Sequence, residues 1–389
     1  MTRESDGSVS SAPRRVLPTS LVALAILSNA VDAQSIVSTR PEVAVVDLVY
    51  QHEFGRVHSA RELADGRVIV SDATDRELLV LSADGKTARR IGRQGPGPSE
   101  YSNPTKAFIA GRDSSLFVDA TDGRWYMLAG ENFTTIPSSW TAMRLAARAT
   151  IAGVDARGLA LALVGTSKEP RGNRYIATGW VGDADSVLVL LLRANGPSDT
   201  VARLAGGSMG RTMVEARRNG AAMSFRVRNP LSTYDQAVLF SDGFIATVSA
   251  HPYRVAWRTP SGAWIRGSVV PDLAQPVDER VKHRAAAGYL RNDDGSAVLS
   301  SALFPPWPKV VPPFLAEALH AGLDGKLYVT RTRLHPEDEL IVDVFSRDGS
   351  REQTMRTPPG GRLVGVGARH VYVAREAADG ADALSRIRR

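Results

Sequence analysis

The feature that most constrains this chain is a strand–turn–strand unit, first found between Arg61 and Tyr101, that recurs along the sequence. Two short apolar runs, 68–70 and 78–81, are separated by the polar turn 72–75. An Asp-Gly pair lies close to each run, and this dipeptide supplies the positive φ angle that a hairpin turn needs. Apolar runs of about four residues bounded by turn residues are typical of strands. The unit therefore predicts an antiparallel meander.

Comparable units of roughly 40 residues each follow one another to the end of the chain. After the first unit, at residues 55–92, the others begin near Pro104, Thr150, Tyr234, Ala318 and Leu363. Each has three or four predicted strands, which is the composition of one propeller blade. The sequence therefore predicts an all-β fold, a six-bladed β-propeller.

The two ends of the predicted ring complement each other. Val43–Tyr50 reads as a strand that has no hairpin partner beside it in the sequence, and the last unit is one strand short. An unpaired edge strand invites aggregation. We therefore expect the N-terminal strand to be the outer strand of the sixth blade, where it closes the ring.

One segment between the fourth and fifth units departs from the strand pattern. Residues 276–288 begin with proline, carry acids in the first turn and bases in the last, and end with glycine, so they predict a short helix. The proline-rich stretch 304–313 after it is expected to be extended. Two interpretations remain open: a plain linker between blades, or a lid over the central channel. Trp307 in this stretch is a candidate ligand contact, whereas Trp125 and Trp257 fall within strand patterns and are expected in the core.

The N-terminus has the pattern of an export signal. Arg14 and Arg15 precede the apolar stretch 16–30, which is shorter than the roughly 20 residues of a membrane span. Residues 31–33 fit a signal peptidase site. We expect residues 1–33 to be a signal peptide and residues 34–389 to be one propeller domain, secreted or periplasmic and without a membrane span. The alternative is a buried N-terminal helix.

Composition excludes several kinds of site. The chain has no cysteine, so disulfides, thiolate metal sites and a cysteine nucleophile are impossible. Its formal net charge is +7, but the basic residues are nearly all arginines scattered among aspartates. A nucleic-acid binder would gather them in a stripe with aromatic residues between them. We therefore expect no nucleic-acid partner.

The link after the first unit carries a resemblance to a known group. Ile91–Tyr101 (I-G-R-Q-G-P-G-P-S-E-Y) resembles the glycine–proline link G-x-x-G-x-G-P-G-E-[FY] of secreted bacterial six-bladed β-propeller proteins related to NHL-repeat and TolB-like propellers. Here Ser99 replaces the glycine before the acid, and the spacing is shifted by one residue. Residues 322–329 and 362–373 resemble the same group. The resemblance implies a six-bladed propeller over about 43–389 and leaves function open, because propellers host many activities.

The link itself is not expected to bind phosphate. Residues 92–98 lack a Gly-Lys-Ser/Thr ending and a following helix, and two prolines remove N–H donors that a phosphate cradle needs. A tight crossover from one blade to the next is the better interpretation.

Few residues point to chemistry by local pattern. The seven histidines are dispersed without His-x-His or His-x-x-x-His spacing. Lactonase-type propellers resemble this fold and hold calcium with carboxylate and amide oxygens from separate blades. Asp72 and Asp119, each at the end of the second strand of its unit, are the nearest candidates for such a cage. Each is also placed to cap the turn that follows it.

The sequence thus favours an exported, monomeric, non-catalytic binding module without a cofactor, whose ligand is a protein, peptide or glycan. The alternative is a calcium-dependent hydrolase or lactonase with a metal in the central channel. That alternative needs at least three acidic or amide side chains at one mouth of the channel.

Overall fold

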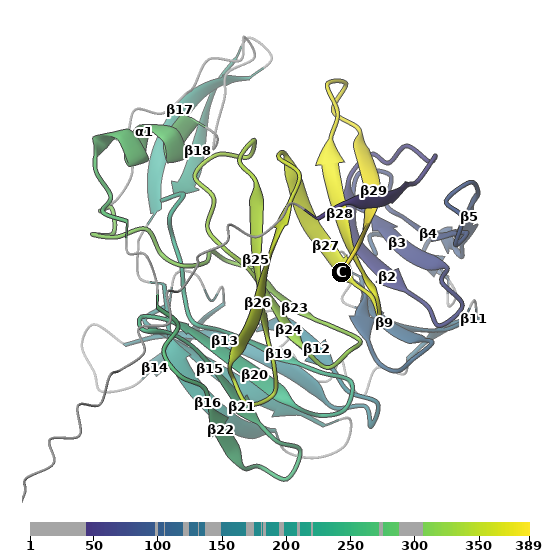
Figure 1. Ribbon diagram of the computed structural model, residues 1–389, viewed down its shortest axis with the longest axis horizontal. Helices are drawn as coiled ribbons and strands as arrows, with labels where there is room; N and C mark the ends of the chain where they lie inside the picture. The colour runs from purple at the N-terminus through teal and green to yellow at the C-terminus, as the bar shows by residue number, and fades with distance from the viewer. Residues whose placement is uncertain are drawn as a thin grey trace, which may run out of the picture. The chain divides into compact units, whose positions relative to one another are not determined.

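Antiparallel sheets of consecutive strands repeat along the chain (Figure 1). The structure is a computed structural model. It describes residues 44–389 except 98–99, 105, 120–123, 131, 137–148, 169–174, 180, 182–183, 194–197, 208–210, 219–220, 272–274 and 288–305. The described residues all belong to the compact unit Pro41–Arg389. The predicted signal peptide, 1–33, lies outside them.

The first three blades follow the order of the chain from the centre outwards. Blade 1 contains β2 (Val57–Glu62), β3 (Val68–Asp72), β4 (Glu77–Leu81) and β5 (Ala88–Ile91). Blade 2 contains β8 (Phe108–Ile109), β9 (Ser114–Val118), β10 (Trp125–Ala129) and β11 (Asn132–Thr135). Blade 3 contains β12 (Ala149–Val154), β13 (Ala160–Lys168), β14 (Tyr175–Gly179), β15 (Ser186–Leu192) and β16 (Asp199–Ala205).

The other three blades repeat the arrangement. Blade 4 contains β19 (Gln236–Leu239), β20 (Ile245–Ala250), β21 (Tyr253–Arg258) and β22 (Trp264–Arg266). Blade 5 contains β23 (Leu319–Ala321), β24 (Leu327–Thr330), β25 (Leu340–Phe345) and β26 (Arg351–Thr357). Blade 6 contains β27 (Gly361–Val366), β28 (His370–Glu376), β29 (Asp382–Arg388) and β1 (Val46–Val49). The chain is therefore a six-bladed β-propeller.

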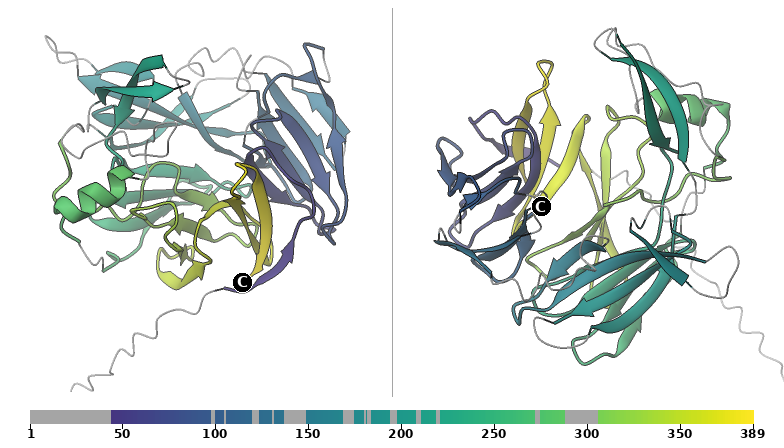
Figure 2. Two further views of the ribbon diagram at one scale, coloured as in Figure 1. Left: turned by 90° about the horizontal axis from the view of Figure 1, so that it is seen from above. Right: turned by 180° about the vertical axis from the view of Figure 1, so that it is seen from behind.

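The N-terminal strand closes the ring as the sequence predicted. β1 pairs antiparallel with β29, with Val46 opposite Ile387, and Figure 2 shows this purple strand beside the yellow C-terminal strands. Arg386 on β29 donates to Asp47 on β1. The first and last parts of the chain thus share one sheet, and that sheet holds the ring shut.

Two glycines allow the innermost strands of neighbouring blades to approach closely. A Cβ atom on Gly365 of β27 would lie 1.9 Å from the carbonyl oxygen of Ala60 on β2. On Gly153 of β12, it would lie 2.3 Å from the carbonyl oxygen of Leu239 on β19. Only glycine fits such approaches. The inner strands therefore form a tight wall around the centre of the ring.

Apolar side chains fill the spaces between blades. The largest described cluster joins blades 4 and 5 around the fully buried Trp257 and Phe345. The guanidinium of Arg347 lies 4.3 Å from the ring centroids of Trp257, Phe240 and Phe244. Trp125 is also buried, with 4% of its surface exposed. Both strand tryptophans are in the core, as predicted.

The segment outside the strand pattern contains the expected helix, α1 (Glu279–Ala287). The Asp278 side chain caps it by accepting the N–H of Val281 at 2.8 Å. Figure 1 shows α1 and a hairpin of β17 (Arg211–Arg218) and β18 (Ala221–Arg228) outside the six sheets. The repeat pattern did not predict this hairpin. None of the helices in the described part of the chain has the length and apolarity to cross a bilayer.

Candidate functional site

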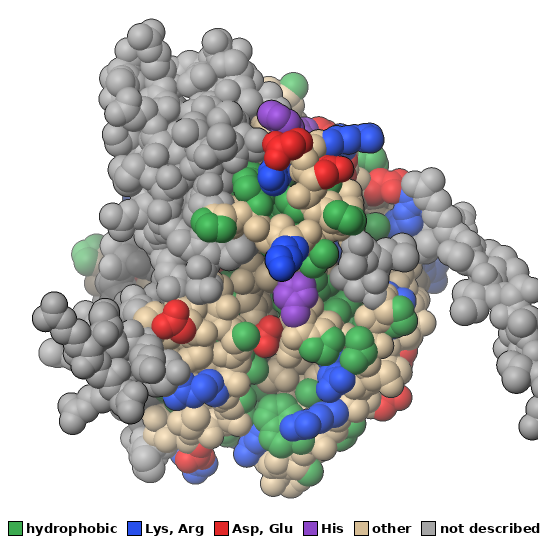
Figure 3. Space-filling view, turned by 90° about the vertical axis from the view of Figure 1, so that its left-hand side faces the viewer, with side chains coloured by type: hydrophobic (Ala, Val, Ile, Leu, Met, Phe, Trp, Pro, Cys, Tyr) green, Lys and Arg blue, Asp and Glu red, His purple; other side chains and the backbone are tan. Residues whose placement is uncertain are grey.

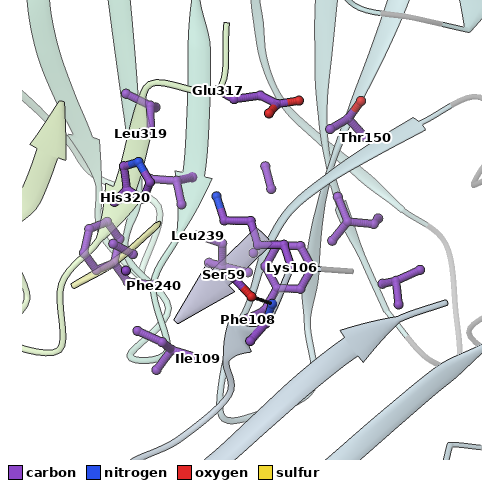
Figure 4. Close-up of a pocket in the computed structure, with 18 of the residues that line it drawn as sticks. Ser59, Lys106, Phe108, Ile109, Thr150, Leu239, Phe240, Glu317, Leu319 and His320 are labelled. Carbon is purple, nitrogen blue, oxygen red and sulfur yellow. Dashed lines mark hydrogen bonds between the residues drawn. The ribbon is translucent and has the colours of Figure 1, made fainter. Parts of the chain in front are cut away.

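A cavity of about 760 Å³ lies at the centre of the ring (Figure 4). It is lined by residues of all six innermost strands, β2, β8, β12, β19, β23 and β27. We call it the axial cavity. Its volume is in the range of pockets that hold small organic ligands, which is roughly 300–1,000 Å³.

Four polar side chains from three neighbourhoods of the chain converge on the axial cavity. His58 lies on β2, Lys106 precedes β8, Glu317 precedes β23, and His320 lies on β23. In Figure 4 the Lys106 amine points into the space between His320 and Glu317. Chain segments far apart in the sequence therefore bring three nitrogen bases and one acid into one space.

The backbone around Lys106 is held in place from two sides. Ser71 donates its hydroxyl to the Pro104 carbonyl at 2.7 Å, and Ala107 donates its N–H to the Ser59 hydroxyl at 2.9 Å. Pro104 also forms an isolated β-bridge with Asp119. These contacts join blades 1 and 2 and fix the position from which the Lys106 side chain enters the cavity.

Glu317 has a backbone conformation that is uncommon for a residue with a side chain. Its φ angle is +60°, in the left-handed region. The buried amide of Gln236 holds both flanks: it donates to the Leu315 carbonyl at 2.6 Å and accepts the N–H of Ala318 at 3.1 Å. Backbone strain of this kind persists only where surrounding contacts impose it, and it is common at functional sites.

The cavity changes the proton affinity of its bases. Burial lowers the pKa of Lys106, and the nearby Glu317 carboxylate opposes that shift. Burial, followed by the charge of Lys106, lowers the pKa of His320 to about 3. The same two causes lower the pKa of His58. The charged forms are disfavoured because the ring of blades replaces water around these groups. At neutral pH the His320 imidazole is therefore neutral.

Four polar side chains at the axial cavity have no hydrogen-bond partner within the described part of the fold. Among the described residues, Lys106 has no hydrogen bond or ion pair, and the side chains of His58, His320 and Glu317 have no hydrogen-bond partner either. Lys106 and His320 are half-buried, whereas His58 and Glu317 are exposed. Polar groups taken out of water are normally satisfied by protein, water or ligand. Such a set, facing a cavity, is therefore arranged to meet something that enters it.

Apolar side chains form the rest of the wall. Phe108 and Ile109 of β8 face the cavity together with Leu319 of β23 and Phe240, which follows β19. An apolar wall with a few convergent polar groups is the usual composition of a small-molecule site. The arrangement suits a ligand with an apolar body and one polar end.

Asp72 has the structural role that was expected for it. This fully buried carboxylate accepts the N–H groups of Gly55 at 2.7 Å, Arg56 at 3.0 Å and Thr74 at 2.9 Å. It therefore caps its own turn and also holds the chain entering blade 1. Capping is confirmed here.

Asp119 repeats this arrangement one blade later. Its carboxylate, also fully buried, accepts the N–H groups of Ser102 at 2.6 Å and Asn103 at 3.2 Å. It lines the axial cavity, and both of these bonds end on its Oδ2, which therefore faces the chain entering blade 2. Within the described ranges, no three His, Asp or Glu side chains are grouped as ligands of a metal ion.

Trp307 lies away from the axial cavity. It packs against the cluster formed by Leu231, Val281 and Ala285, two of which belong to α1. No residue of α1 lines the cavity. Trp307 thus has a packing contact with the helix, and the lid interpretation has no support among the described residues.

The glycine–proline link is a crossover between blades, as predicted. It runs from β5 of blade 1 to β8 of blade 2 and includes the short parallel pair β6 (Arg93–Gln94) and β7 (Glu100–Tyr101). The Glu100 carboxylate accepts the N–H of Gly97 at 2.7 Å, and Arg124 donates to the Gly97 carbonyl at 2.9 Å. Its polar groups are bound to one another.

Lys106, Glu317 and His320 were not identified from the sequence. One signal was available: the first strand of each unit forms the channel wall in a propeller, and these three residues lie on or directly before first strands. The chain has few lysines, and Lys106 is the one in such a position.

On the face shown in Figure 3, basic and acidic side chains are interspersed, and its described part carries no continuous basic stripe. A histidine lies beside a lysine or arginine near the middle of this face.

The match to a family model agrees with the fold. Residues 36–125 match a family described as "6-bladed beta-propeller". A protein of Bacteroides fragilis described as exported is 9% identical, with 90% of this chain and 97% of that chain covered and a TM-score of 0.46. A gluconolactonase of Xanthomonas campestris is 10% identical, with 89% and 98% covered and a TM-score of 0.40.

A third solved structure, virginiamycin B lyase from Staphylococcus aureus, is 11% identical, with 88% of this chain and 98% of that chain covered and a TM-score of 0.37. No curated protein sequence matches the chain. At these values the structural likenesses carry no argument about activity. The function has to be inferred from the axial cavity itself.

Proposed function

We propose that the protein is a binding module that takes a small organic acid into the axial cavity. The observation that carries this proposal is the set of four polar side chains that face the cavity without a partner among the described residues. The sequence favoured a protein, peptide or glycan as the ligand. The proposal replaces this expectation with a small molecule, or with the acidic end of a larger one.

An acid is favoured by the balance of groups. Of the four lining side chains without a hydrogen-bond partner, His58, Lys106 and His320 are nitrogen bases, and only Glu317 is a carboxylate. An empty cavity disfavours the charged form of Lys106. A ligand carboxylate would supply the missing counter-charge and accept charge-assisted hydrogen bonds, which are the stronger ones. The aromatic and aliphatic wall would hold the apolar body of the ligand.

The proposal has a pH dependence with a definite sign. A bound carboxylate stabilises protonated Lys106, so binding takes up a proton wherever the free amine is neutral. Affinity should therefore fall as the pH rises. The titratable and charged groups that line the cavity, and so take part in this balance, are His58, Arg61, Lys106, Asp119, Tyr234, Glu317 and His320.

Isothermal titration calorimetry with 4-bromobenzoate tests the proposal, and 4-bromobenzamide is the neutral control of the same shape. Lys106→Met should weaken binding of the acid by at least tenfold, because a charge-assisted hydrogen bond contributes about 1.5–3 kcal/mol. Lys86→Met is the matched control, since the Lys86 side chain is 68% exposed in a turn of blade 1. Equal binding of acid and amide, or an equal effect of both substitutions, would refute the proposal.

We also propose that the protein acts outside the cytoplasm, after removal of residues 1–33. The basic pair, the apolar stretch 16–30 and the small residues before Gln34 support this proposal. N-terminal sequencing of the protein recovered from the producing cells should begin at Gln34. Recovery of the intact N-terminus from the cytoplasm would contradict it.

A further inference from the structure

We propose that Lys106 is a nucleophilic amine that forms an imine with aldehydes or ketones entering the axial cavity. The inference goes beyond reversible binding of an acid, because it requires a new covalent bond and no acidic group on the ligand. It rests on where the Lys106 amine lies and on what surrounds it.

The first step is the position of the amine. The Lys106 side chain projects from a backbone segment fixed by Ser59 and Ser71, and its amine points into the open volume of the cavity. It forms no ion pair with any described residue. An amine that lies free in a small-molecule cavity can approach a carbonyl carbon, whereas one held by a carboxylate is protonated and shielded.

The second step is the protonation state. Only the neutral amine is a nucleophile, and a lysine is activated by desolvation in an apolar pocket. Burial lowers the pKa of Lys106, while the charge of Glu317 works in the opposite direction. Phe108 and Ile109 follow Lys106 two and three residues along the chain and supply part of the apolar wall.

The third step is the chemistry. The nitrogen lone pair of Lys106 attacks the carbonyl carbon, the C=O π bond opens, and one N–H proton passes to the oxygen to give a neutral carbinolamine. The C–O bond then breaks as the second N–H proton passes to the hydroxyl group, which leaves as water and leaves the C=N bond. The overall reaction joins amine and carbonyl and releases one water, so no oxidant or reductant is needed. Glu317 is an acid–base group at the same cavity that can exchange the protons.

Benzaldehyde is a suitable probe, because its ring fits an apolar wall and it carries no acid. Incubation at neutral pH with sodium cyanoborohydride traps an imine: hydride adds to carbon, a solvent proton adds to nitrogen, and a stable secondary amine results. Peptide mapping by mass spectrometry then reports the rate at each of the six lysines in one sample. Lys106 should be labelled at least tenfold faster than the exposed Lys86.

The pH profile separates this inference from simple accessibility. The labelling rate of an ordinary lysine falls about tenfold per pH unit below its pKa, and the rate at Lys106 should level off at a lower pH. Glu317→Gln removes the charge that raises the pKa of Lys106, so it should move the Lys106 profile to lower pH. Glu352→Gln, on the outer strand of blade 5, is the control and should leave it in place.

Labelling of Lys106 no faster than that of Lys86 would overturn the inference. An unchanged Lys106 profile in Glu317→Gln would also overturn it, provided that the variant melts at the wild-type temperature. The outcome is independent of acid binding, because benzaldehyde tests the amine alone and 4-bromobenzoate tests the acid site alone.

Discussion

His320 provides a quantitative test of how strongly the axial cavity excludes charge. Its pKa is lowered from 6.5 to about 3, chiefly by burial. The unfolded chain therefore binds a proton at this residue between pH 6.5 and 3, and the folded protein does not. When the pKa of a base is lower in the folded than in the unfolded state, the folded protein loses stability as the pH falls through this window. Each unit below pH 6.5 costs about 1.4 kcal/mol, so His320 should cost the protein about 2–3 kcal/mol between pH 7.5 and 4.5.

His320→Gln removes this pH-dependent loss of stability and keeps a polar side chain of similar size. Urea unfolding of wild type and variant at pH 7.5, 6.5, 5.5 and 4.5 gives the free energy of unfolding of each. As the pH falls from 7.5 to 4.5, the free energy of unfolding of the variant should rise by about 2–3 kcal/mol relative to that of the wild type. His283→Gln makes the same chemical change on the exposed surface of α1 and serves as the control. A constant difference between wild type and His320→Gln would show that the cavity does not exclude the imidazolium.

Three further predictions concern the ring itself. Gly365→Ala should destabilise the protein by about 1–3 kcal/mol in urea unfolding, since its Cβ would lie 1.9 Å from a backbone oxygen of β2; Gly111→Ala, whose Cβ meets its nearest atom at 3.6 Å, should cost much less. Arg347→Met should lower stability by about 1–2 kcal/mol, because it removes a cation held between three aromatic rings; an unchanged unfolding midpoint would show that the stacked charge contributes nothing. Melting curves in excess calcium and in EDTA should coincide, because the carboxylates of the two candidate aspartates accept backbone N–H groups; a calcium-dependent rise would reveal a bound ion.

The blades were predictable because their signals are local. Runs of apolar residues, Asp-Gly turns and the spacing of the units are properties of short stretches of sequence, and they gave six blades and their order. The closure by β1 followed from the same patterns, because the last unit lacked one strand and the predicted strand Val43–Tyr50 had no partner beside it. The role of Asp72 as a cap was also local, since this residue directly precedes its turn. The turn after Asp119 lies outside the described residues, so the cap expected there stays a prediction.

The site was not predictable in this way, because it exists only after six distant strands meet. Lys106, Glu317 and His320 have ordinary neighbours in the sequence, and their proximity depends on how neighbouring blades dock. The left-handed conformation of Glu317 is imposed by Gln236, a residue of the preceding blade. The β17–β18 hairpin was missed for a different reason: it lies between two units and carries no repeat spacing.

Locating a bound acid tests the central claim most directly. Crystals of the protein soaked in 4-bromobenzoate can be measured at the bromine absorption edge, where anomalous scattering marks the bromine position. We expect a single strong peak inside the axial cavity, with the carboxylate toward the Lys106 amine and the ring against Phe108. Bromine peaks only on the outer surface of the blades, with the axial cavity empty, would contradict the proposed function.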